Sequence, residues 1–333
     1  MVKKTDIVIL WVDDTDEEWV KKKKYWQEKF GIRNEQKERY RDWNNLQYLF
    51  RGIEKFAPWV NHVFLVTDNQ QPEWINTEYS KLTIIDHQEI IPKEYLPTFN
   101  SQVLELNLHR IPNLSDQFIY FNDDVFLIND TVPEDFFVKG VPRDNASLNL
   151  IMPIKRNLIS QVVFNNTTLI NDYFDKKLTL KKGWKKWLNF NHGIENIRTL
   201  LLWIWPNFSS FKQPHLVGVF KKDTFDQVWS LYSEELRSTF ANRFRQFNDY
   251  NQWLFRDWQL ASNNFIPQKR GFGKDFQLSD KNTVLRCAKA IKNQKHKIIC
   301  VNDTELLEDF NHSRDIINSS FQEILSNKSE FEL

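Results

Sequence analysis

Four short apolar runs alternate with amphipathic segments in the first part of the chain. They cover residues 7–12, 63–66, 82–85 and 118–121. Short apolar runs of this kind, rich in β-branched or aromatic residues and closed by polar ones, are typical of buried strands. Strands that alternate with helices predict an α/β fold with a parallel sheet and right-handed crossovers.

Helical spacing appears between these runs. Leu46, Leu49, Phe50 and Ile53 recur every three or four residues, which predicts a helix over 40–56 that Pro58 closes. Residues 101–109 also fit a helix. Residues 196–260 are expected to be mainly helical, whereas 142–191 are less patterned and suggest an inserted subdomain. The tail beyond Gly271 is polar apart from the apolar run 298–301.

Acidic residues follow each predicted strand. Asp13, Asp68 and Asp86 end the first three, and the adjacent pair Asp123 and Asp124 ends the fourth. Ligands of parallel sheets bind beyond the carboxyl ends of the strands. The pattern therefore predicts a polar, metal-assisted site at this edge of the sheet.

The pair Asp123 and Asp124 carries the metal prediction. Mg²⁺ takes one or two carboxylates together with phosphate oxygens and water, so this pair is suited to holding Mg²⁺ or Mn²⁺ against a diphosphate. The alternative is an ordinary turn, since turns are rich in Asp. Asp13 is a second candidate for metal or donor contact, and Asp16 is a weaker one. The alternative is that Asp16 or Asp14 merely caps the following helix.

Three further motifs offer cations or a base, and each also has a purely structural interpretation. Arg110 could clamp a phosphate, or it could stabilise a helix C-terminus. His215, in Gln213-Pro214-His215, could deprotonate a sugar hydroxyl because its pKa lies near working pH, although a lone His is more often structural.

The third motif, Arg243-x-Arg245-x-x-Asn248-Asp249, could neutralise charge on a transferring phosphoryl group. It could also be a solvated helical face on which Arg pairs with Asp. The chain matches neither glycine-rich phosphate-binding fingerprint. Any phosphate would then be held by metal and arginine.

Composition narrows the class of protein. The 333 residues carry a formal net charge of +1, which argues against a dedicated nucleic-acid binder. Aromatic residues reach 15%, as core anchors or as platforms for sugar rings. The two cysteines, Cys287 and Cys300, form neither a disulfide framework nor a zinc site.

The expected location is the cytoplasm. The start of the chain has no apolar signal region, and no apolar run approaches the ~20 residues of a spanning helix. Two lysine-rich stretches, 21–24 and the segment around Trp184, raise the hypothesis of peripheral contact with the inner face of the cell membrane. Both stretches could equally be solvated faces.

Taken in order, these pieces resemble the Stealth family of bacterial polysaccharide phosphotransferases, to which the catalytic precursor of the animal lysosomal-enzyme phosphotransferase is related. The four family blocks look like residues 6–19, 40–137, 213–255 and 300–303. The second block contains Val66-Thr67-Asp68, Asn100-Ser101, His109-Arg110-Ile111-Pro112 and Tyr120-Phe121-Asn122-Asp123-Asp124. Asp14 departs from the family, which commonly has Gly there.

The resemblance implies a Rossmann-like, GT-A-like core with a helical C-terminal half and an inserted subdomain. It divides the chain into a catalytic core (1–140), a variable insertion (141–195), a helical part of the catalytic domain (196–265) and a C-terminal segment (266–333).

The resemblance also implies a reaction. A sugar-1-phosphate would move from a UDP-hexose or UDP-N-acetylhexosamine to a hydroxyl of an oligosaccharide or lipid-linked polysaccharide, with Mg²⁺ or Mn²⁺ as cofactor and UMP as leaving group. His215 would be the general base, Arg245 a phosphate stabiliser, and Asp124 a catalytic metal ligand beside Asp123.

Donor or acceptor contacts would come from Asp13, Asn100, Arg110, Asp123 and Asp249. Two alternatives stay open on the residues alone. One is a metal-dependent glycosyltransferase that releases UDP, and the other is a carbohydrate-binding module with aromatic platforms.

Overall fold

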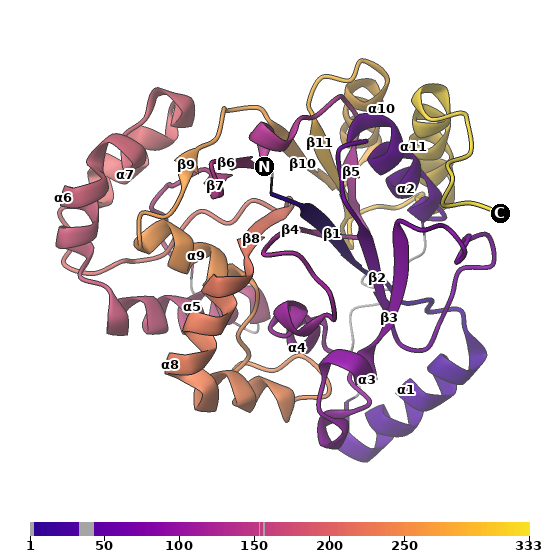
Figure 1. Cartoon of the computed structure of the whole chain (residues 1–333), viewed down its shortest axis with the longest axis horizontal. Coiled ribbons are helices and arrows are strands. Elements are labelled where there is room, and N and C mark those ends of the chain that lie inside the picture. Colours follow the sequence, from indigo (N-terminus) through magenta and orange to yellow (C-terminus); the bar gives the residue numbers. More distant parts are fainter. Residues whose placement is uncertain (1–2, 33–42, 153, 156) are drawn as a thin grey trace. The chain divides into compact units, whose positions relative to one another are not determined.

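The computed structural model describes residues 3–32, 43–152, 154–155 and 157–333 (Figure 1). Its strands are β1 (Thr5–Leu10), β2 (Val63–Thr67), β3 (Leu82–Asp86), β4 (Gln117–Asn122), β5 (Val125–Leu127), β6 (Phe137–Val138), β7 (Val141–Asp144), β8 (Gly218–Lys221), β9 (Ile266–Pro267), β10 (Gly273–Leu278) and β11 (Ile298–Asp303).

The α-helices are α1 (Glu17–Phe30), α2 (Leu46–Phe56), α3 (His87–Ile90), α4 (Ser101–Glu105), α5 (Leu158–Tyr173), α6 (Lys176–Trp187), α7 (Glu195–Trp203), α8 (Lys222–Phe240), α9 (Trp253–Ala261), α10 (Lys281–Lys292) and α11 (Phe310–Ile324). Short 3₁₀ turns are η2 (Lys93–Tyr95), η3 (Leu108–Arg110), η4 (Pro133–Asp135) and η5 (Phe190–His192).

Two compact units make up the chain, and each is built from segments that are distant in sequence. The first unit comprises Met1–Val8, His87–Tyr120 and Val132–Arg270. The second comprises Ile9–Asp86, Phe121–Thr131 and Gly271–Leu333. The five strands of the main sheet have the order β3-β2-β1-β4-β8. Strands β2 and β3 belong to the second unit and β8 belongs to the first, while β1 and β4 each contribute residues to both.

The second unit contains the parallel pair β2 and β3, which runs in register from Val63 opposite Leu82 to Thr67 opposite Asp86. Just beyond β1, the Trp11 amide donates to the Val66 carbonyl at 3.0 Å. All five residues of β2 are buried, as expected of a strand covered on both faces.

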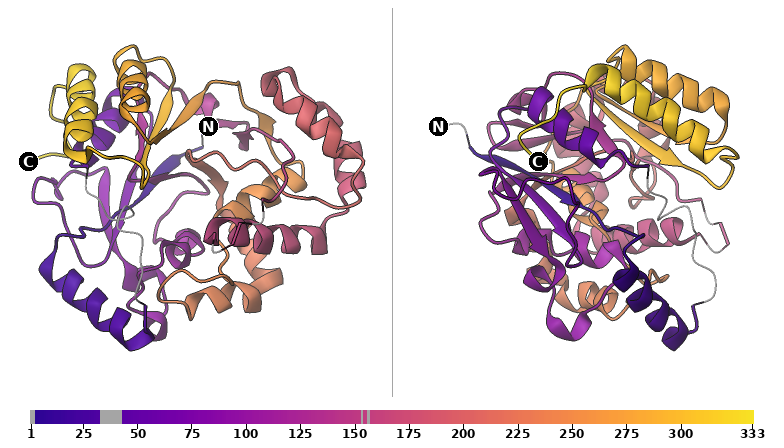
Figure 2. Two further views of the ribbon diagram at one scale, coloured as in Figure 1. Left: turned by 180° about the vertical axis from the view of Figure 1, so that it is seen from behind. Right: turned by 90° about the vertical axis from the view of Figure 1, so that its right-hand side faces the viewer.

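A three-stranded sheet of order β10-β11-β5 completes the second unit. Strands β10 and β11 run parallel, while β5 pairs antiparallel with β11 and places Val125 opposite Cys300. Helices α10 and α11 lie side by side next to this sheet (Figure 2).

The first unit is built around the antiparallel pair β4 and β8, with Phe118 opposite Phe220. Aromatic rings fill its core. Phe225 packs against both of these rings, and it stacks on Phe255 of α9 with ring centroids 3.6 Å apart. For these aromatics the core interpretation is confirmed.

The α/β class is confirmed, but the main sheet is mixed because β8 runs antiparallel to β4. The four predicted strands correspond to β1, β2, β3 and β4. The expectation of a mainly helical 196–260 missed β8 and the irregular stretch 241–252. The division of the chain into four consecutive regions stays a prediction. The two compact units do not test it, because each unit combines segments that are distant in sequence.

Two predicted helices are shorter than expected. The helix predicted over 40–56 is α2, which begins at Leu46, and residues 40–42 lie outside the described part of the chain. The helix predicted over 101–109 breaks into α4 and η3. There the Asn107 side chain donates to the Val103 carbonyl at 2.7 Å, a local bond of the kind that competes with regular helix.

The polar tail is more regular than its sequence pattern indicated, because it forms β10, α10, β11 and α11. Among the helices of the described residues, none has the length and apolar character needed to cross a membrane.

Candidate active site

The second unit holds the acidic pair in a tight turn. Asp123 and Asp124 form the two residues between β4 and β5, and Asp123 is exposed. The Asp124 carbonyl accepts a 2.8 Å hydrogen bond from the Val301 amide, which fixes the turn against the adjoining strand β11. The pair therefore lies at the end of a buried strand, as predicted. It also forms a turn, so its position alone does not separate a metal site from an ordinary turn.

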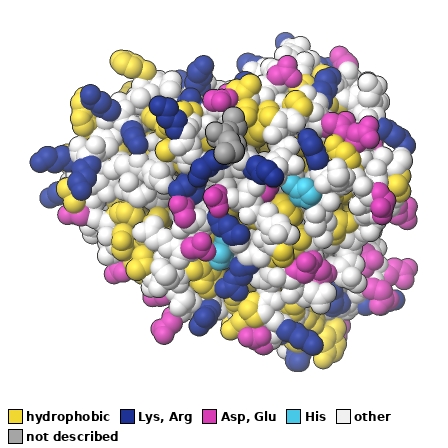
Figure 3. Space-filling view, in the orientation of Figure 1, with side chains coloured by type: hydrophobic (Ala, Val, Ile, Leu, Met, Phe, Trp, Pro, Cys, Tyr) yellow, Lys and Arg dark blue, Asp and Glu magenta, His cyan; other side chains and the backbone are white. Residues whose placement is uncertain are grey.

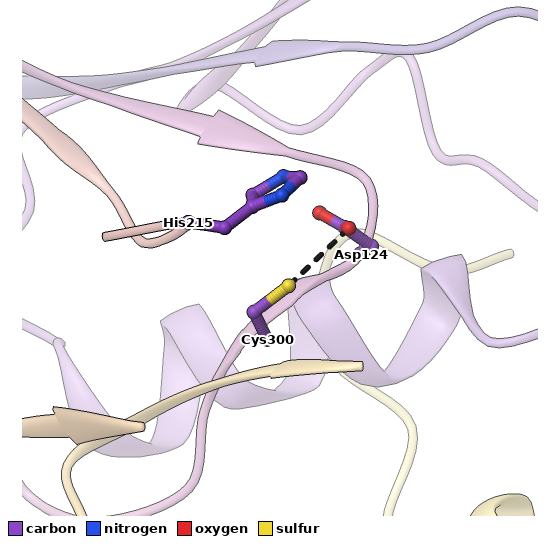
Figure 4. Close-up of side chains that lie close together, drawn as sticks. All are labelled: Asp124, His215 and Cys300. Atoms are coloured by element: carbon purple, nitrogen blue, oxygen red, sulfur yellow. Dashed lines mark hydrogen bonds between the residues drawn. The ribbon is translucent and has the colours of Figure 1, made fainter. Parts of the chain in front are cut away.

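Cys300 contacts this turn directly. Its Sγ donates to Asp124 Oδ2 at 3.3 Å, drawn as a dashed line in Figure 4, which also labels His215 of the first unit. Burial raises the pKa of the Cys300 thiol well above its usual range, and the negative charge of Asp124 raises it further. The thiol therefore stays protonated and orients the carboxylate.

The chemistry of this turn fits a hard divalent cation. Asp123 and Asp124 supply carboxylate oxygens, which Mg²⁺ and Mn²⁺ prefer. Cys300 donates a hydrogen bond to the Asp124 carboxylate.

Asp13 is held in place by Gln70. Its amide donates to Gln70 Oε1 at 2.8 Å, and Gln70 Nε2 returns a 2.8 Å bond to the Asp13 carbonyl. Asp13 Oδ1 accepts from the amide and hydroxyl of Thr15 at 2.8 and 2.6 Å. Asp16 caps α1 by accepting from the Trp19 amide at 2.6 Å, which confirms the capping interpretation for that residue.

In the first unit, helix α9 fixes the loop that carries His215. Gln213 Nε2 lies 2.8 Å from both carboxylate oxygens of Asp257. Arg256 Nη1 donates to Gln213 Oε1 at 2.8 Å and to the Lys212 carbonyl at 2.9 Å. Both ends of the Gln213 amide are thereby satisfied, two residues before His215.

Asp257 is fully buried, and burial raises its pKa to about 7 although the positive charge of Arg256 opposes this. Arg256 also pairs with Asp144 at 2.7 Å. One guanidinium thus joins β7 and α9 to the loop before β8, where half-buried His215 lies. Sequence reasoning did not select Arg256 or Asp257.

Arg245 lies in a second cluster of the first unit, around the buried carboxylate of Glu105. Arg245 Nη2 donates to Ser101 Oγ at 2.7 Å, and Ser101 donates to Glu105 Oε1 at 3.2 Å. The Gln252 amide donates to Glu105 Oε2 at 3.3 Å. Burial raises the pKa of Glu105, while the positive charge of Arg245 and the hydrogen bonds from Gln252 and Ser101 lower it, with a smaller electrostatic effect of His215.

Glu105 is thus the buried carboxylate at the centre of this cluster, with an electrostatic effect of His215 upon it, and sequence reasoning missed it. The available signal was a single acidic residue inside the apolar stretch Val103-Leu104-Glu105-Leu106. A carboxylate at a position that the pattern assigns to the core needs a partner, and here Ser101 and Gln252 supply it.

Asn100 and Asp249 form a buried network behind Arg245. Asn100 Nδ2 donates to Asp249 Oδ2 at 2.9 Å, and Asn242 Nδ2 donates to Asp249 Oδ1 at 2.7 Å. The Gln246 amide adds a third bond at 2.7 Å. Burial raises the pKa of Asp249 to about 6. These contacts hold the 242–249 loop, and a substrate role for Asn100 or Asp249 stays a prediction.

Arg243 and Arg110 have other surroundings. Arg243 donates to the carbonyls of Tyr95 and Pro97 and so fastens its loop to the segment before α4. Arg110 is exposed, and its guanidinium lies 4.9 Å from the ring centroid of Trp229. Its pKa is lowered by partial burial and by Arg237.

Comparison with known proteins gives one family. A family model described as "Stealth protein CR2, conserved region 2" matches residues 39–144. The chain is 39% identical to an exopolysaccharide phosphotransferase, cps2G, of Lactiplantibacillus plantarum, over 98% of this chain and 96% of that protein. It is 37% identical to a receptor polysaccharide phosphotransferase, WefC, of Streptococcus gordonii, over the full length of both.

A capsular polysaccharide phosphotransferase, WcwK, of Streptococcus pneumoniae is 36% identical over 99% of this chain and 98% of its own. Among solved structures, the chain is similar to the galactosyltransferase LgtC in complex with donor and acceptor sugar analogs. That likeness has 11% identity and a TM-score of 0.42, and it covers 94% of this chain and 95% of that one.

Proposed function

The chain belongs to the Stealth family and is a polysaccharide phosphotransferase of capsule or exopolysaccharide synthesis, and from that premise we propose its reaction. It transfers a sugar-1-phosphate from a UDP-hexose or UDP-N-acetylhexosamine to a carbohydrate hydroxyl. The acceptor is an oligosaccharide or a lipid-linked polysaccharide. The products are UMP and a phosphodiester.

The observation that carries this proposal is the buried carboxylate of Glu105 in the first unit. Arg245 is joined to it through the Ser101 hydroxyl, and the imidazole of His215 interacts with it electrostatically. Phosphoryl transfer needs positioning and charge neutralisation more than covalent chemistry. A base for the hydroxyl and a cation for the phosphate oxygens meet both needs.

In the proposed step, the acceptor oxygen attacks the phosphorus that bears the sugar. His215 takes the hydroxyl proton, and the bond from that phosphorus to the UMP oxygen breaks, with its electron pair leaving on UMP. Arg245 stabilises the negative charge of the phosphoryl oxygens. The bond between C1 and its oxygen is untouched, so the anomeric configuration of the sugar is kept.

The proposed cofactor is Mg²⁺ or Mn²⁺, held by Asp123 and Asp124, where it would neutralise charge on the diphosphate. Asp13 and Arg110 are proposed donor contacts. Asn100 and Asp249 are proposed to act on substrate through the loop that carries Arg245.

The experiment uses the purified full-length chain with a panel of UDP-sugars, Mg²⁺ or Mn²⁺, and an oligosaccharide acceptor. We expect UMP in the nucleotide fraction and a new phosphodiester in the phosphorus NMR spectrum. Both should be lost in His215→Ala and in Asp124→Ala. His312→Ala, which changes an exposed histidine of α11, should retain them. Release of UDP with a plain glycoside would contradict the proposal.

A further inference from the structure

One side of helix α7 and the residues flanking it expose a row of apolar side chains, here called the α7 stripe. It consists of Ile194, Ile197, Leu200, Leu201, Ile204 and Trp205, which are 49–79% exposed. Their spacing of three or four residues places them along one side of the helix. Thr199 and Leu202 form the opposite, buried side.

Contiguous exposed apolar surface of this kind marks an interaction site, whereas single exposed apolar residues are ordinary. The stripe contains no charged residue. The acidic residue at its start, Glu195, is neutralised by Arg198 at 3.2 Å and by Lys212 at 2.5 Å. The stripe is therefore free of uncompensated negative charge.

Helix α6, which adjoins α7, is strongly basic. It contains six lysines and no acidic residue. One of them, buried Lys176, donates to the carbonyls of Leu202 and Trp205 at 2.6 and 2.9 Å. The start of α6 is thereby fastened to the end of α7.

The other end of each helix is anchored to a neighbouring segment of the chain. The Asn196 side chain of α7 donates to the Asn189 carbonyl at 2.8 Å, and Lys186 of α6 donates to the Asn263 carbonyl at 2.6 Å. The remaining lysines, together with Trp184, stay exposed on α6 (Lys177, Lys181, Lys182 and Lys185). Lys and Arg side chains gather along the left-hand edge of Figure 3, where Figure 1 places α6 and α7.

We propose that α6 and α7 dock this protein on an anionic membrane surface. The α7 stripe would enter the boundary between headgroups and acyl chains, and the exposed lysines of α6 would meet the lipid phosphates. This charge complementarity distinguishes lipid from a second copy of the chain. In a symmetric contact between copies, the lysines of one α6 would lie near those of the other, and like charges repel.

The other lysine-rich helix, α1, lacks this combination. Lys21 lies within salt-bridge distance of Glu17 and Glu18, and Lys22 pairs with Asp68 at 2.6 Å. Its charge is compensated by neighbouring carboxylates. Helix α1 therefore supplies a control for the effect of lysine number alone.

The test is co-sedimentation of the full-length chain with vesicles of phosphatidylcholine alone, or of phosphatidylcholine with phosphatidylglycerol. We expect binding to the anionic vesicles at low salt, weakened as salt rises, and little binding to the neutral ones. Lys181→Gln/Lys182→Gln/Lys185→Gln should weaken binding by about tenfold or more. The matched Lys21→Gln/Lys23→Gln/Lys24→Gln variant should bind as the parent does.

Leu201→Ser tests the apolar part of the surface. It should weaken vesicle binding severalfold, whereas Leu306→Ser should not, although the two leucines are 68% and 70% exposed. Because both side chains lie at the surface, the melting temperature should not change in either variant. The proposal would be overturned if the chain bound neutral and anionic vesicles equally, or if it bound neither at low salt. It would also be overturned if the control variants lost as much binding as the test variants. A dimer in solution that Leu201→Ser dissociates would overturn it too.

Discussion

Gln213 donates from one amide nitrogen to both carboxylate oxygens of Asp257, at 2.8 Å to each. Asp257 belongs to α9, and Gln213 precedes His215 by two residues. The position of the predicted general base is therefore set by a buried carboxylate that does not itself need to touch substrate. Asp257 is a positioning residue in this account.

Replacing Asp257 by Asn should lower kcat by about 10²-fold, because small displacements of a catalytic group are costly. The donor KM should change little, since the donor contacts are elsewhere. Steady-state kinetics well below the melting temperature separate the two parameters. Asp226→Asn, an exposed carboxamide change on α8, should leave both near the parent values. A rise in donor KM at unchanged kcat would contradict a positioning role.

Asp257 also makes a prediction about pH and stability. Its pKa is about 7 in the folded protein against an ordinary value of 3.8. Between these values the folded protein holds a proton that the unfolded chain has released, so raising the pH lowers the stability of the folded state. The stabilisation that comes from holding this proton is fully present below about pH 4 and is lost as the pH rises through about 7.

The melting temperatures of the parent and of Asp257→Asn, measured from pH 4 to pH 8, isolate this contribution because the other titrating groups are common to both. We expect the melting temperature of Asp257→Asn to rise relative to that of the parent as pH increases through this window. Above the window the difference between the two melting temperatures should stay constant. A melting temperature of Asp257→Asn that falls relative to that of the parent as pH rises would exclude a raised pKa for Asp257.

The two arginines of the 243–245 segment should behave differently. Arg245→Gln removes the cation beside Ser101 and Glu105 and should lower kcat by about 10³-fold with little change in melting temperature. Arg243→Gln removes donors to two backbone carbonyls and should cost about 1–3 kcal/mol of stability.

Activity per folded molecule, combined with thermal unfolding, distinguishes the two variants. Folded Arg243→Gln should keep most of its kcat. If it lost as much kcat as Arg245→Gln, the separation of roles between these arginines would be wrong.

The two cysteines provide a matched pair for the metal site. Both are fully buried, and burial raises the pKa of each thiol, but of the two it is Cys300 that donates a hydrogen bond to Asp124. Cys300→Ala should raise the Mg²⁺ concentration needed for half-maximal activity, because Asp124 loses the donor that orients it. Cys287→Ala should not, although both variants lose some packing. Equal metal dependence in the two variants would argue against Asp124 as a ligand oriented by Cys300.

Much of the fold could be predicted because buried strands have a local signature. The strands β1 to β4 are short apolar runs that end in polar residues, and the structure places them there. Strand β8 could not be predicted in this way. Its residues Gly218–Lys221 carry no distinctive pattern and become a strand through pairing with β4.

The candidate site also contains residues that the sequence could predict and residues that it could not. Asp123, Asp124, His215 and Arg245 were selected because their side chains suit the chemistry and their motifs fit a family. Glu105 and Asp257 were missed, because an acidic residue inside an apolar helix has no meaning until its partners are known. Those partners, Gln252 and Gln213, are 147 and 44 residues away in sequence.

Transfer of a sugar-1-phosphate is tested most directly by following the oxygen between C1 of the sugar and its phosphorus. A donor labelled with ¹⁸O at that bridging position is turned over by the full-length chain, and the products are analysed by mass spectrometry. Phosphoryl transfer predicts that the label stays with the sugar, inside the new phosphodiester, and that the released UMP is unlabelled. Label found in released UDP would mean that the C1–oxygen bond broke, and the chain would then transfer the sugar alone.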